Sequence, residues 1–361
     1  MTDAKELAAL YSPKEMKSLK AERQLCVVRF SPCGKYLAAG GYDGLVRRWN
    51  AAGAEFAELP PLVGHRGWVS GLAFHTESSR LYTADSWGRL RAWNYADAAP
   101  APLWDAAGAH DGWIHGLAAS PDGKLLATCG MDQMVRIWDA ATGQKLHELA
   151  GHALNVLCLA FHPDGKSLVS GDLAGVVKQW DATTGAHVRD LDAKELYLAS
   201  RLQDVGGVRT MAFDAEGRML ACGGARPKIG GNVQGTPLVI MFDWANGAVS
   251  RKLELGQDSD VYVSDFHFDP HGFIVAATSG NPGVGKLLMQ RPQDKEPFFS
   301  IAKPNLHSLC RHPNGRRLAV TGTNPNSNGN GRIKSPDGKE EYPGNWSPIY
   351  VFDLPAPAED A

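Results

Sequence analysis

One stretch of the chain carries the three side-chain types of a hydrolytic catalytic triad. His110, Thr128 and Asp132 bring an imidazole, a hydroxyl and a carboxylate, which together activate a nucleophile in many hydrolases. The imidazole and the hydroxyl recur in phase on either side of this stretch, as His65 with Thr83 and as His152 with Ser170. Because a catalytic set is needed once in a chain, residues that repeat in phase favour a structural role over catalysis.

Other kinds of reactive site lack their sequence patterns. The six cysteines are scattered with no Cys-x-x-Cys pair, and the twelve histidines show no spacing typical of a metal site. The glycine-rich stretches 280–285 and 329–331 do not lead into a helix with Lys-Ser/Thr, as a phosphate-binding loop does. We therefore predict no catalytic residue, no metal and no cofactor, and expect that the chain is not an enzyme.

A repeated pattern of strands supplies the elements that position these residues. An apolar strand, a four-residue turn that usually ends in glycine and a second apolar strand recur seven times, as around 120–123 and 162–165. Proline presets one turn dihedral and glycine takes the position with positive φ, so each copy closes a β-hairpin. A third strand follows each hairpin and ends in a large apolar residue, at Trp49, Trp93, Trp138, Trp180, Phe242, Met289 or Phe352. The seven copies indicate one repeat architecture instead of two or three ordinary domains.

These motifs resemble the WD40-repeat family. Four of the third strands end in Trp-Asp or Trp-Asn, and a Gly-His or Ala-His pair opens three repeats. The resemblance covers about residues 15–354 and implies an all-β protein, a seven-bladed β-propeller of four-stranded antiparallel blades. One blade cannot cover its two apolar faces alone, so seven blades stack radially around a central channel. We expect a single domain over residues 1–361, with an N-terminal helix or arm at 1–14, the blades at 15–354 and a flexible tail at 355–361.

The resemblance also implies a structural role for the histidines. In the family, a histidine, a serine or threonine, an aspartate and the tryptophan of one repeat form a buried hydrogen-bond network. The third repeat carries the full set, which is His110, Thr128, Asp132 and Trp138. The second and fourth repeats carry partial sets, with Trp87 and Ala174 at the aspartate position. These sets are His65, Thr83 and Trp93, and His152, Ser170 and Trp180.

The N-terminal segment is expected to close the ring. Too few residues follow Phe352 to form a fourth strand of the seventh blade, so residues 15–19 are expected to supply that strand, as is common in the family. Before them, Asp3 and Glu6 have the spacing of a capping box. This spacing predicts a short helix with Leu7 and Leu10 on one side.

The loops on the two faces of the ring differ in length. Because strand directions alternate, the turns between second and third strands and the connections between blades share one face. Long inserts are expected on that face at 193–205, 225–236 and 322–345, over blades five to seven. Long loops on a rigid scaffold are where binding usually takes place.

The start of each innermost strand lies on the same face. The WD40 family often contacts partners through these positions and through the residue before the turn aspartate. Tryptophan, tyrosine and arginine are over-represented in the hot spots of protein interfaces. The candidate partner-binding residues are therefore Tyr42, Trp68, Trp113, His115, Met131, Arg209, Tyr262 and His307.

Composition limits the partners and the compartment. The 361 residues are 43% hydrophobic and 21% charged with a net charge of −2, which provides a large core but no general attraction to nucleic acid or anionic membranes. No apolar run approaches the roughly 20 residues of a membrane helix, and residues 1–10 lack a secretory signal pattern. Five of the six cysteines lie in apolar runs, as buried free thiols of a reducing compartment do. We expect a cytoplasmic protein, monomeric by itself, with no nucleic-acid or membrane partner.

Two functions remain open at this point. The leading one is a non-catalytic scaffold that binds a protein or peptide, of unknown identity, through its loop-rich face. The alternative is a propeller enzyme or small-ligand binder with a site at the central channel mouth, near Arg209, His115 and His307. No carboxylate is expected to join these three in the register of the strands, although acidic residues of the last insert, such as Asp337 and Glu340, would bring one.

Overall fold

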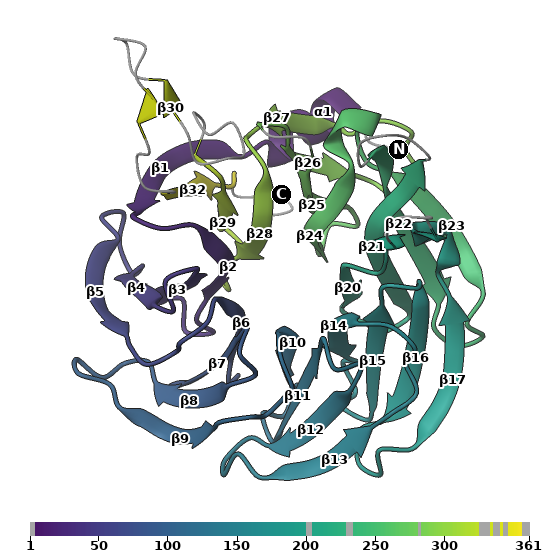
Figure 1. Cartoon of the computed structure of the whole chain (residues 1–361). Helices are drawn as coiled ribbons and strands as arrows, with labels where there is room; N and C mark the ends of the chain where they lie inside the picture. The colour runs from purple at the N-terminus through teal and green to yellow at the C-terminus, as the bar shows by residue number, and fades with distance from the viewer. Residues whose placement is uncertain are drawn as a thin grey trace.

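Seven four-stranded antiparallel sheets stand around a central channel like the blades of a propeller (Figure 1). The computed structural model describes residues 4–199, 204–228, 234–280, 283–324, 333–334, 340–341 and 346–355. The predicted all-β class and the seven-bladed arrangement are confirmed. In this described part, the strands are accompanied by one α-helix, α1 (Ala4–Tyr11), and by two 3-10 helices, η1 (Lys194–Leu196) and η2 (Asp258–Asp260).

The first four blades run in chain order from the channel outward. Blade one consists of β2 (Leu25–Phe30), β3 (Tyr36–Gly41), β4 (Val46–Asn50) and β5 (Ala57–Leu62). Blade two consists of β6 (Val69–Phe74), β7 (Arg80–Asp85), β8 (Leu90–Asn94) and β9 (Pro102–Ala106). Blade three consists of β10 (Ile114–Ala119), β11 (Leu125–Gly130), β12 (Val135–Asp139) and β13 (Lys145–Leu149). Blade four consists of β14 (Val156–Phe161), β15 (Ser167–Asp172), β16 (Val176–Asp181) and β17 (His187–Asp192).

Blades five and six follow the same order, and blade seven borrows its outer strand from the start of the chain. Blade five consists of β20 (Thr210–Phe213), β21 (Met219–Lys228), β22 (Gln234–Asp243) and β23 (Val249–Glu254). Blade six consists of β24 (Tyr262–Phe268), β25 (Ile274–Ser279), β26 (Lys286–Gln290) and β27 (Phe299–Ala302). Blade seven consists of β28 (Leu306–Arg311), β29 (Arg317–Gly322), β32 (Ser347–Asp353) and β1 (Lys14–Ala21). Two small sheets lie outside the blades, β18 (Tyr197–Ala199) with β19 (Asp204–Gly206) and β30 (Ile333–Lys334) with β31 (Glu340–Glu341).

The hydrophobic core is divided into layers between neighbouring blades. In the layer between blades one and two, Val46 and Leu62 pack with Leu72, Leu81 and Trp93, and all five are at most 4% exposed. Equivalent clusters fill the other six junctions, including the one between blades seven and one. Each blade therefore depends on both neighbours to remove its apolar faces from water.

Within the described chain, three hairpin turns bond directly to the turn of a neighbouring blade, one through Thr76 and Pro121 and two through a histidine. The Nε2 atom of His162 donates to the carbonyl oxygen of Gly217, and that of His312 donates to the carbonyl oxygen of Gly34, each at 2.9 Å. Both glycines have positive φ, and a Cβ on either would lie within 2.5 Å of the histidine ring. Glycine is therefore required there both by the turn and by the approach of the next blade.

The predicted closure of the ring by the N-terminal segment is confirmed. β1 pairs antiparallel with β32, with Glu15 opposite Phe352 and Leu19 opposite Ile349. Leu19 is 7% exposed and belongs to the cluster that joins blade seven to blade one. The strand thus completes blade seven and covers one side of blade one.

The predicted short helix forms as α1, but its buried side is narrower than expected. Leu7 is buried, whereas Leu10 is 38% exposed. The ring of Tyr11 packs instead against His271 and Phe273 of blade six, with centroid distances of 4.8 and 5.1 Å. These contacts orient the helix so that Leu10 points away from the propeller. The proposed capping residue Asp3 lies outside the described residues.

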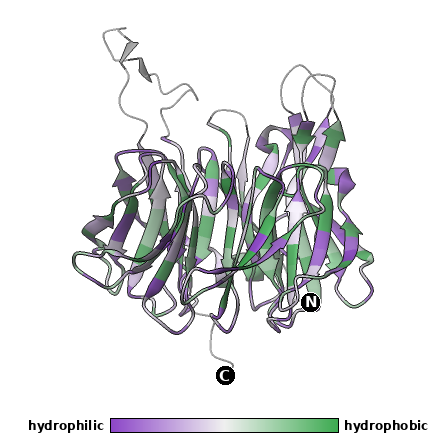
Figure 2. Cartoon of the chain, turned by 60° about the horizontal axis from the view of Figure 1, so that its bottom comes forward, coloured by the Kyte–Doolittle hydropathy of each residue, from purple (hydrophilic) through white to green (hydrophobic). Residues whose placement is uncertain are grey.

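Two of the expected inserts contain regular secondary structure. Residues 225–236 lengthen β21 and β22, which stay paired from Met219 opposite Asp243 to Lys228 opposite Gln234. The 193–205 segment contributes η1 and the β18–β19 hairpin, and Nε of Arg226 donates to Oε1 of Glu195 at 2.9 Å, which ties this segment to blade five. Both rise above the same face of the ring (Figure 2). Most of the third insert, Asp337 included, lies outside the described residues, as does the side chain of Glu340.

The outer edge of the ring is irregular. A β-bulge interrupts the pairing of the outermost strand in six of the seven blades. The bulged residues Leu103, Leu146 and Val188 are between 44% and 53% exposed. In blade six the outermost strand, β27, is four residues long.

Deleting residues 1–21 should destabilise the whole ring. The deletion leaves the backbone of β32 unpaired and uncovers the apolar neighbours of Leu19 in blade one. We expect the melting temperature, followed by circular dichroism, to fall by several degrees with more aggregation. Deleting residues 1–11 removes α1 but keeps β1 and should have a smaller effect. Equal losses from the two deletions would contradict closure by β1.

Candidate interaction site at the channel mouth

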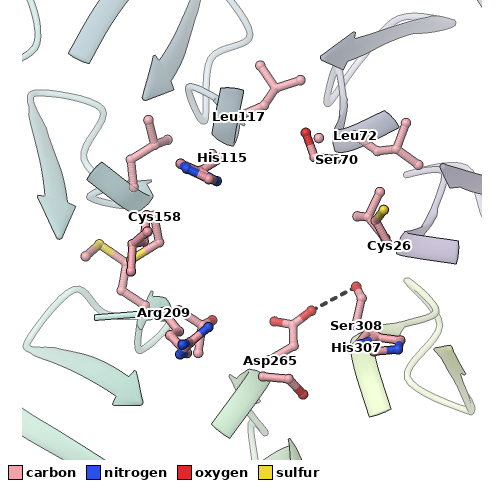
Figure 3. A pocket seen from close by; sticks show the side chains of 18 of the residues that line it. Cys26, Ser70, Leu72, His115, Leu117, Cys158, Arg209, Asp265, His307 and Ser308 are labelled. Atoms are coloured by element: carbon pink, nitrogen blue, oxygen red, sulfur yellow. Dashed lines mark hydrogen bonds between the residues drawn. The ribbon is translucent and has the colours of Figure 1, made fainter. Parts of the chain in front are cut away.

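One face of the ring opens into a cavity at the mouth of the central channel. The cavity has a volume of about 410 Å³ and is lined by side chains from all seven blades. A second space of about 250 Å³ continues it into the channel. Each blade contributes one side chain from the same position to both spaces, and these are Cys26, Ser70, His115, Leu157, Arg209, Ser264 and His307. Figure 3 shows Cys26, Ser70, His115, Arg209 and His307 around the opening.

β-Bulges in the innermost strands aim these side chains into the channel. In six blades the pairing register shifts across the lining residue, as it does around His115 in β10 and around His307 in β28. A bulge turns the extra residue out of the regular alternation of a strand. In blade five, Arg209 comes directly before β20, and its backbone N–H donates to the carbonyl of Gly223 at 2.9 Å.

The eight residues predicted to bind a partner lie on this face. Six of them line the cavity, namely Tyr42, Trp113, His115, Arg209, Tyr262 and His307. Trp68 lies beside the cavity, with its ring stacked on that of Tyr42. Met131 lies farther out at the blade-three turn, 54% exposed, and its backbone N–H donates to the carbonyl of Trp113.

Aromatic rings form a continuous surface over blades one to three. The rings of Tyr42 and Trp68 are parallel with centroids 4.3 Å apart, and Trp68 meets Trp113 edge to face at 5.4 Å. Tyr42 and Trp68 are each about two-fifths exposed. We call Tyr42, Trp68, Trp87 and Trp113 the aromatic patch.

Trp87 is a member of this patch that sequence reasoning missed as a contact residue. The repeat pattern places Trp87 where the structural network of blade two would have its aspartate. The tryptophan is nevertheless 66% exposed. Its indole lies against Gly67, where a Cβ would be 2.8 Å from Cδ1 of Trp87. The sequence did indicate this exposure, because Trp87 stands at the tip of a short turn. A side chain at such a position has little hydrophobic core within reach.

The cavity carries one uncompensated positive charge. Arg209 is exposed and its guanidinium lies 4.5 Å from the centre of the Tyr262 ring. Among the described residues it makes no ion pair. Burial, with smaller effects of His110 and Arg209, lowers the pKa of His115 to about 4, and burial lowers that of His307 to about 4. Both imidazoles are therefore neutral at pH 7.

Deeper in the channel lies a carboxylate that was not expected there. Oδ2 of Asp265 accepts from Oγ of Ser308 at 3.0 Å (Figure 3). It also accepts from Arg29 at 3.3 Å and from the backbone N–H of Leu309 at 3.0 Å. In a regular strand, neighbouring side chains point to opposite sides, so Asp265 would point away from the channel into which Ser264 points. The bulge between Val263 and Asp265 changes this alternation. The expectation that no carboxylate joins the channel is thus wrong. The contacts tie the inner strands of blades one, six and seven together.

The histidine networks are present in three blades. In the third blade, His110 contacts Asp132 and Thr128 at 2.8 Å each, and Nε1 of Trp138 donates to Thr128 at 2.8 Å. The same triangle joins His65, Thr83 and Trp93 in blade two, and His152, Ser170 and Trp180 in blade four. The side chains of His65, His110 and His152 are fully buried, so no substrate reaches them.

The expectation that only the third blade has an aspartate is wrong. Asp85 and Asp172 contact Nδ1 of His65 and His152 at 2.8 Å, in place of the positions of Trp87 and Ala174. These aspartates end the second strand of their blades, where blade three has Gly130. A carboxylate reaches the imidazole from either position, so blade three uses Asp132 because glycine offers no side chain.

The described residues contain no group of three histidine, cysteine or acidic side chains placed to hold a metal ion. Within the same part of the chain, no helix has the length and apolar character needed to span a bilayer.

The WD40 family model, described as WD domain, G-beta repeat, matches residues 14–50, 58–94, 107–139 and 143–181. These segments cover the first three strands of each of blades one to four, and three of them begin with the outer strand of the preceding blade. The structure adds three further blades of the same four-stranded form. The chain is a member of the WD40-repeat β-propeller family.

Individual WD40 relatives match shorter segments. Human striatin is 36% identical over 86 residues, which is 21% of this chain and 11% of striatin. An uncharacterized WD repeat-containing protein of Schizosaccharomyces pombe is 25% identical over 131 residues, 35% of each chain. Protein HIR1 of Eremothecium gossypii is 26% identical over 166 residues, 38% of this chain and 20% of HIR1. The matches thus span a minor part of each relative.

Replacing Asp172 by alanine should destabilise the protein. The change leaves the buried Nδ1–H of His152 without its acceptor, which costs about 2 kcal/mol of unfolding free energy. Asp190 is a matched control, because it is about half exposed and its ion pair with Lys178 is worth less than about 1 kcal/mol. Chemical denaturation of both alanine variants measures the difference. A loss at Asp172 no larger than that at Asp190 would contradict the network.

The neutral channel histidines predict a pH-dependent stability. In the folded protein the pKa values of His115 and His307 are lowered from 6.5 to about 4, so between these pH values the unfolded chain binds more protons. The unfolding free energy should therefore fall as pH drops from 6.5 to 4 and change less below that. The double variant His115→Gln/His307→Gln should have a shallower slope in urea titrations over this window. Parallel slopes would show that these histidines are not responsible.

Proposed function

We propose that this propeller is a non-catalytic scaffold that binds a protein or peptide through the face carrying the channel mouth. The observation that carries the proposal is the aromatic patch, in which the rings of Tyr42, Trp68 and Trp113 are already packed on one another. Exposed aromatic residues beside a cavity have the composition of interface hot spots. Because the rings hold each other in place, little side-chain entropy is lost on binding.

The elements around the patch support an adaptable partner surface. Blade five carries the lengthened β21–β22 hairpin on the same face, with Arg226 paired to Glu195 and Glu254. The face therefore has an apolar half over blades one to three and a charged half over blade five. A folded partner or an extended peptide that crosses the channel mouth would contact both halves.

The chemistry of the channel favours binding over catalysis. Asp265 is the one carboxylate in the seven described inner strands, and three donors already occupy one of its oxygens. His115 and His307 make no hydrogen bond to a serine, threonine or cysteine among the described residues. Among the described residues that line the channel mouth, a nucleophile with an adjacent base, which a hydrolytic site needs, is thus lacking.

The family supports the same proposal at a coarser level. WD40 proteins characteristically bind other proteins, and the relatives with a matching segment include striatin and HIR1. We also propose a cytoplasmic monomer without nucleic-acid or membrane partners. All six cysteines are free, and burial raises the pKa of Cys129, Cys158 and Cys222, as expected of unreactive thiols.

Removing two exposed indoles should abolish binding without unfolding the protein. The double variant Trp68→Ala/Trp87→Ala truncates the outer part of the aromatic patch. Each hot-spot truncation costs about 2 kcal/mol of binding, so capture of partners by affinity purification should fall at least tenfold. Because neither side chain belongs to a hydrophobic core cluster of the described chain, the melting temperature should stay within a few degrees.

The matched control for this pair is Leu103→Ala/Val188→Ala. Leu103 and Val188 are each 53% exposed, which lies between the exposures of Trp68 and Trp87. They lie on the outer edges of blades two and four. The control should retain all partners in quantitative mass spectrometry. If the tryptophan variant captures the same partners as the wild type, the binding surface lies elsewhere and the proposed function of this face is wrong.

A further inference from the structure

The channel mouth presents hydrogen-bond donors that have no acceptor within the described chain. The guanidinium of Arg209 and the hydroxyls of Tyr42 and Tyr262 all line the cavity. None of the three donates to a described residue. Burial is the main reason that the pKa of Tyr42 is raised to about 12, so this phenol keeps its proton at pH 7.

The other polar groups of the rim carry no charge. Ser70 donates to the carbonyl of Ile114 at 2.6 Å, and Ser264 donates to that of Ala277 at 3.0 Å. Burial raises the pKa of the Cys26 thiol to about 12, and His115 and His307 are neutral. The rim thus offers one positive charge, the two tyrosine hydroxyls and no negative charge. Nε1 of Trp113 and Nε2 of His115 also lack a hydrogen-bond partner among the described residues.

The charged groups below the rim limit the charge of the ligand that Arg209 can bind. Arg29 is already balanced by Asp265 inside the channel, at 3.3 Å. A ligand group with two negative charges would face one free cation above a fixed carboxylate. A group with a single negative charge matches the free charge, and a planar carboxylate suits the paired N–H groups of arginine.

The surroundings of the cation indicate what carries the carboxylate. Arg209 lies over Tyr262 on one side of the mouth, and Tyr42 begins the aromatic patch on the other. Apolar residues flanking an acidic side chain would therefore rest on Tyr42, Trp68 and Trp87 while the carboxylate reaches Arg209.

We propose that the channel mouth binds the carboxylate of an aspartate or glutamate side chain in an extended, otherwise apolar segment of a partner protein. Arg209 pairs with the carboxylate, the hydroxyls of Tyr42 and Tyr262 donate to it, and the aromatic patch binds the flanking residues. This inference rests on the proposed function, because it names the chemistry of the partner that the face takes.

The test uses a phage-displayed library of random dodecapeptides, panned on the immobilised full chain. Peptides enriched by the wild type should carry an aspartate or glutamate next to aromatic or aliphatic residues. Arg209→Gln should weaken a synthetic enriched peptide at least tenfold in fluorescence anisotropy, and panning on Arg209→Glu should select lysine or arginine at the same place. Tyr42→Phe, which removes one hydroxyl, should weaken the peptide several-fold.

The matched control is Arg23→Gln. Arg23 is exposed in the β1–β2 connection on the same face, outside the cavity lining, and its loss should leave peptide affinity unchanged. Arg209 makes no ion pair with a described residue, so its variants should keep the wild-type melting temperature, which is measured alongside.

The outcomes separate this inference from the proposed function. Enriched peptides without an acidic preference that still lose binding in Trp68→Ala/Trp87→Ala would overturn the inference and leave the function standing. Peptides that bind that variant as well as the wild type would overturn the function. A phosphoserine in place of the acidic residue that binds more than tenfold tighter would overturn the single-charge assignment. A library that yields no peptide would also overturn the inference, since an extended acidic segment is what it requires.

Discussion

Every blade of this propeller has two apolar faces, and water is kept from both only when the ring is complete. The layers between blades are built from strands that are buried along almost their whole length, such as β25. Closure therefore concerns the whole molecule and not one blade. The pairing of β1 with β32 supplies it by hydrogen bonds, and the Arg29–Asp265–Ser308 contacts reinforce it from the channel side. The face that carries the channel mouth is rigid because this closure leaves no blade free to move alone.

The same closed ring explains why the channel mouth is chemically diverse. The blades share a backbone form, and a bulge at one equivalent position in six inner strands points one side chain from each into the channel. Apart from Cys26, which packs partly against the layer between blades one and two, these side chains belong to no core layer, so their types vary from thiol to imidazole to guanidinium. The repeat thus keeps positions constant while the residues at them differ from blade to blade.

Much of this could be predicted from the sequence, because turn glycines and strand-ending tryptophans repeat at nearly constant intervals. The closing strand and the six cavity residues followed from counting along those repeats. Local departures from regular geometry could not be counted in this way. The bulge before Asp265 brought a carboxylate into the channel, and Asp85 and Asp172 reached their histidines from a position where the expected pattern has no aspartate. The role of Trp87 was misassigned for the same reason. Its position in the repeat does not indicate whether its ring packs against other residues or is exposed.

The irregular outer edge of the ring has a consequence for how a partner can attach. A straight, exposed strand edge invites another chain to add a strand through backbone hydrogen bonds, whatever its side chains are. Here bulges break the outermost ladder in six blades, and in the seventh the strand offers four residues. Strand addition along the perimeter is therefore disfavoured at each blade. A partner of the kind we propose would therefore be recognised by side chains on the two flat faces, where the identity of its residues, and not merely its backbone, decides whether it stays bound.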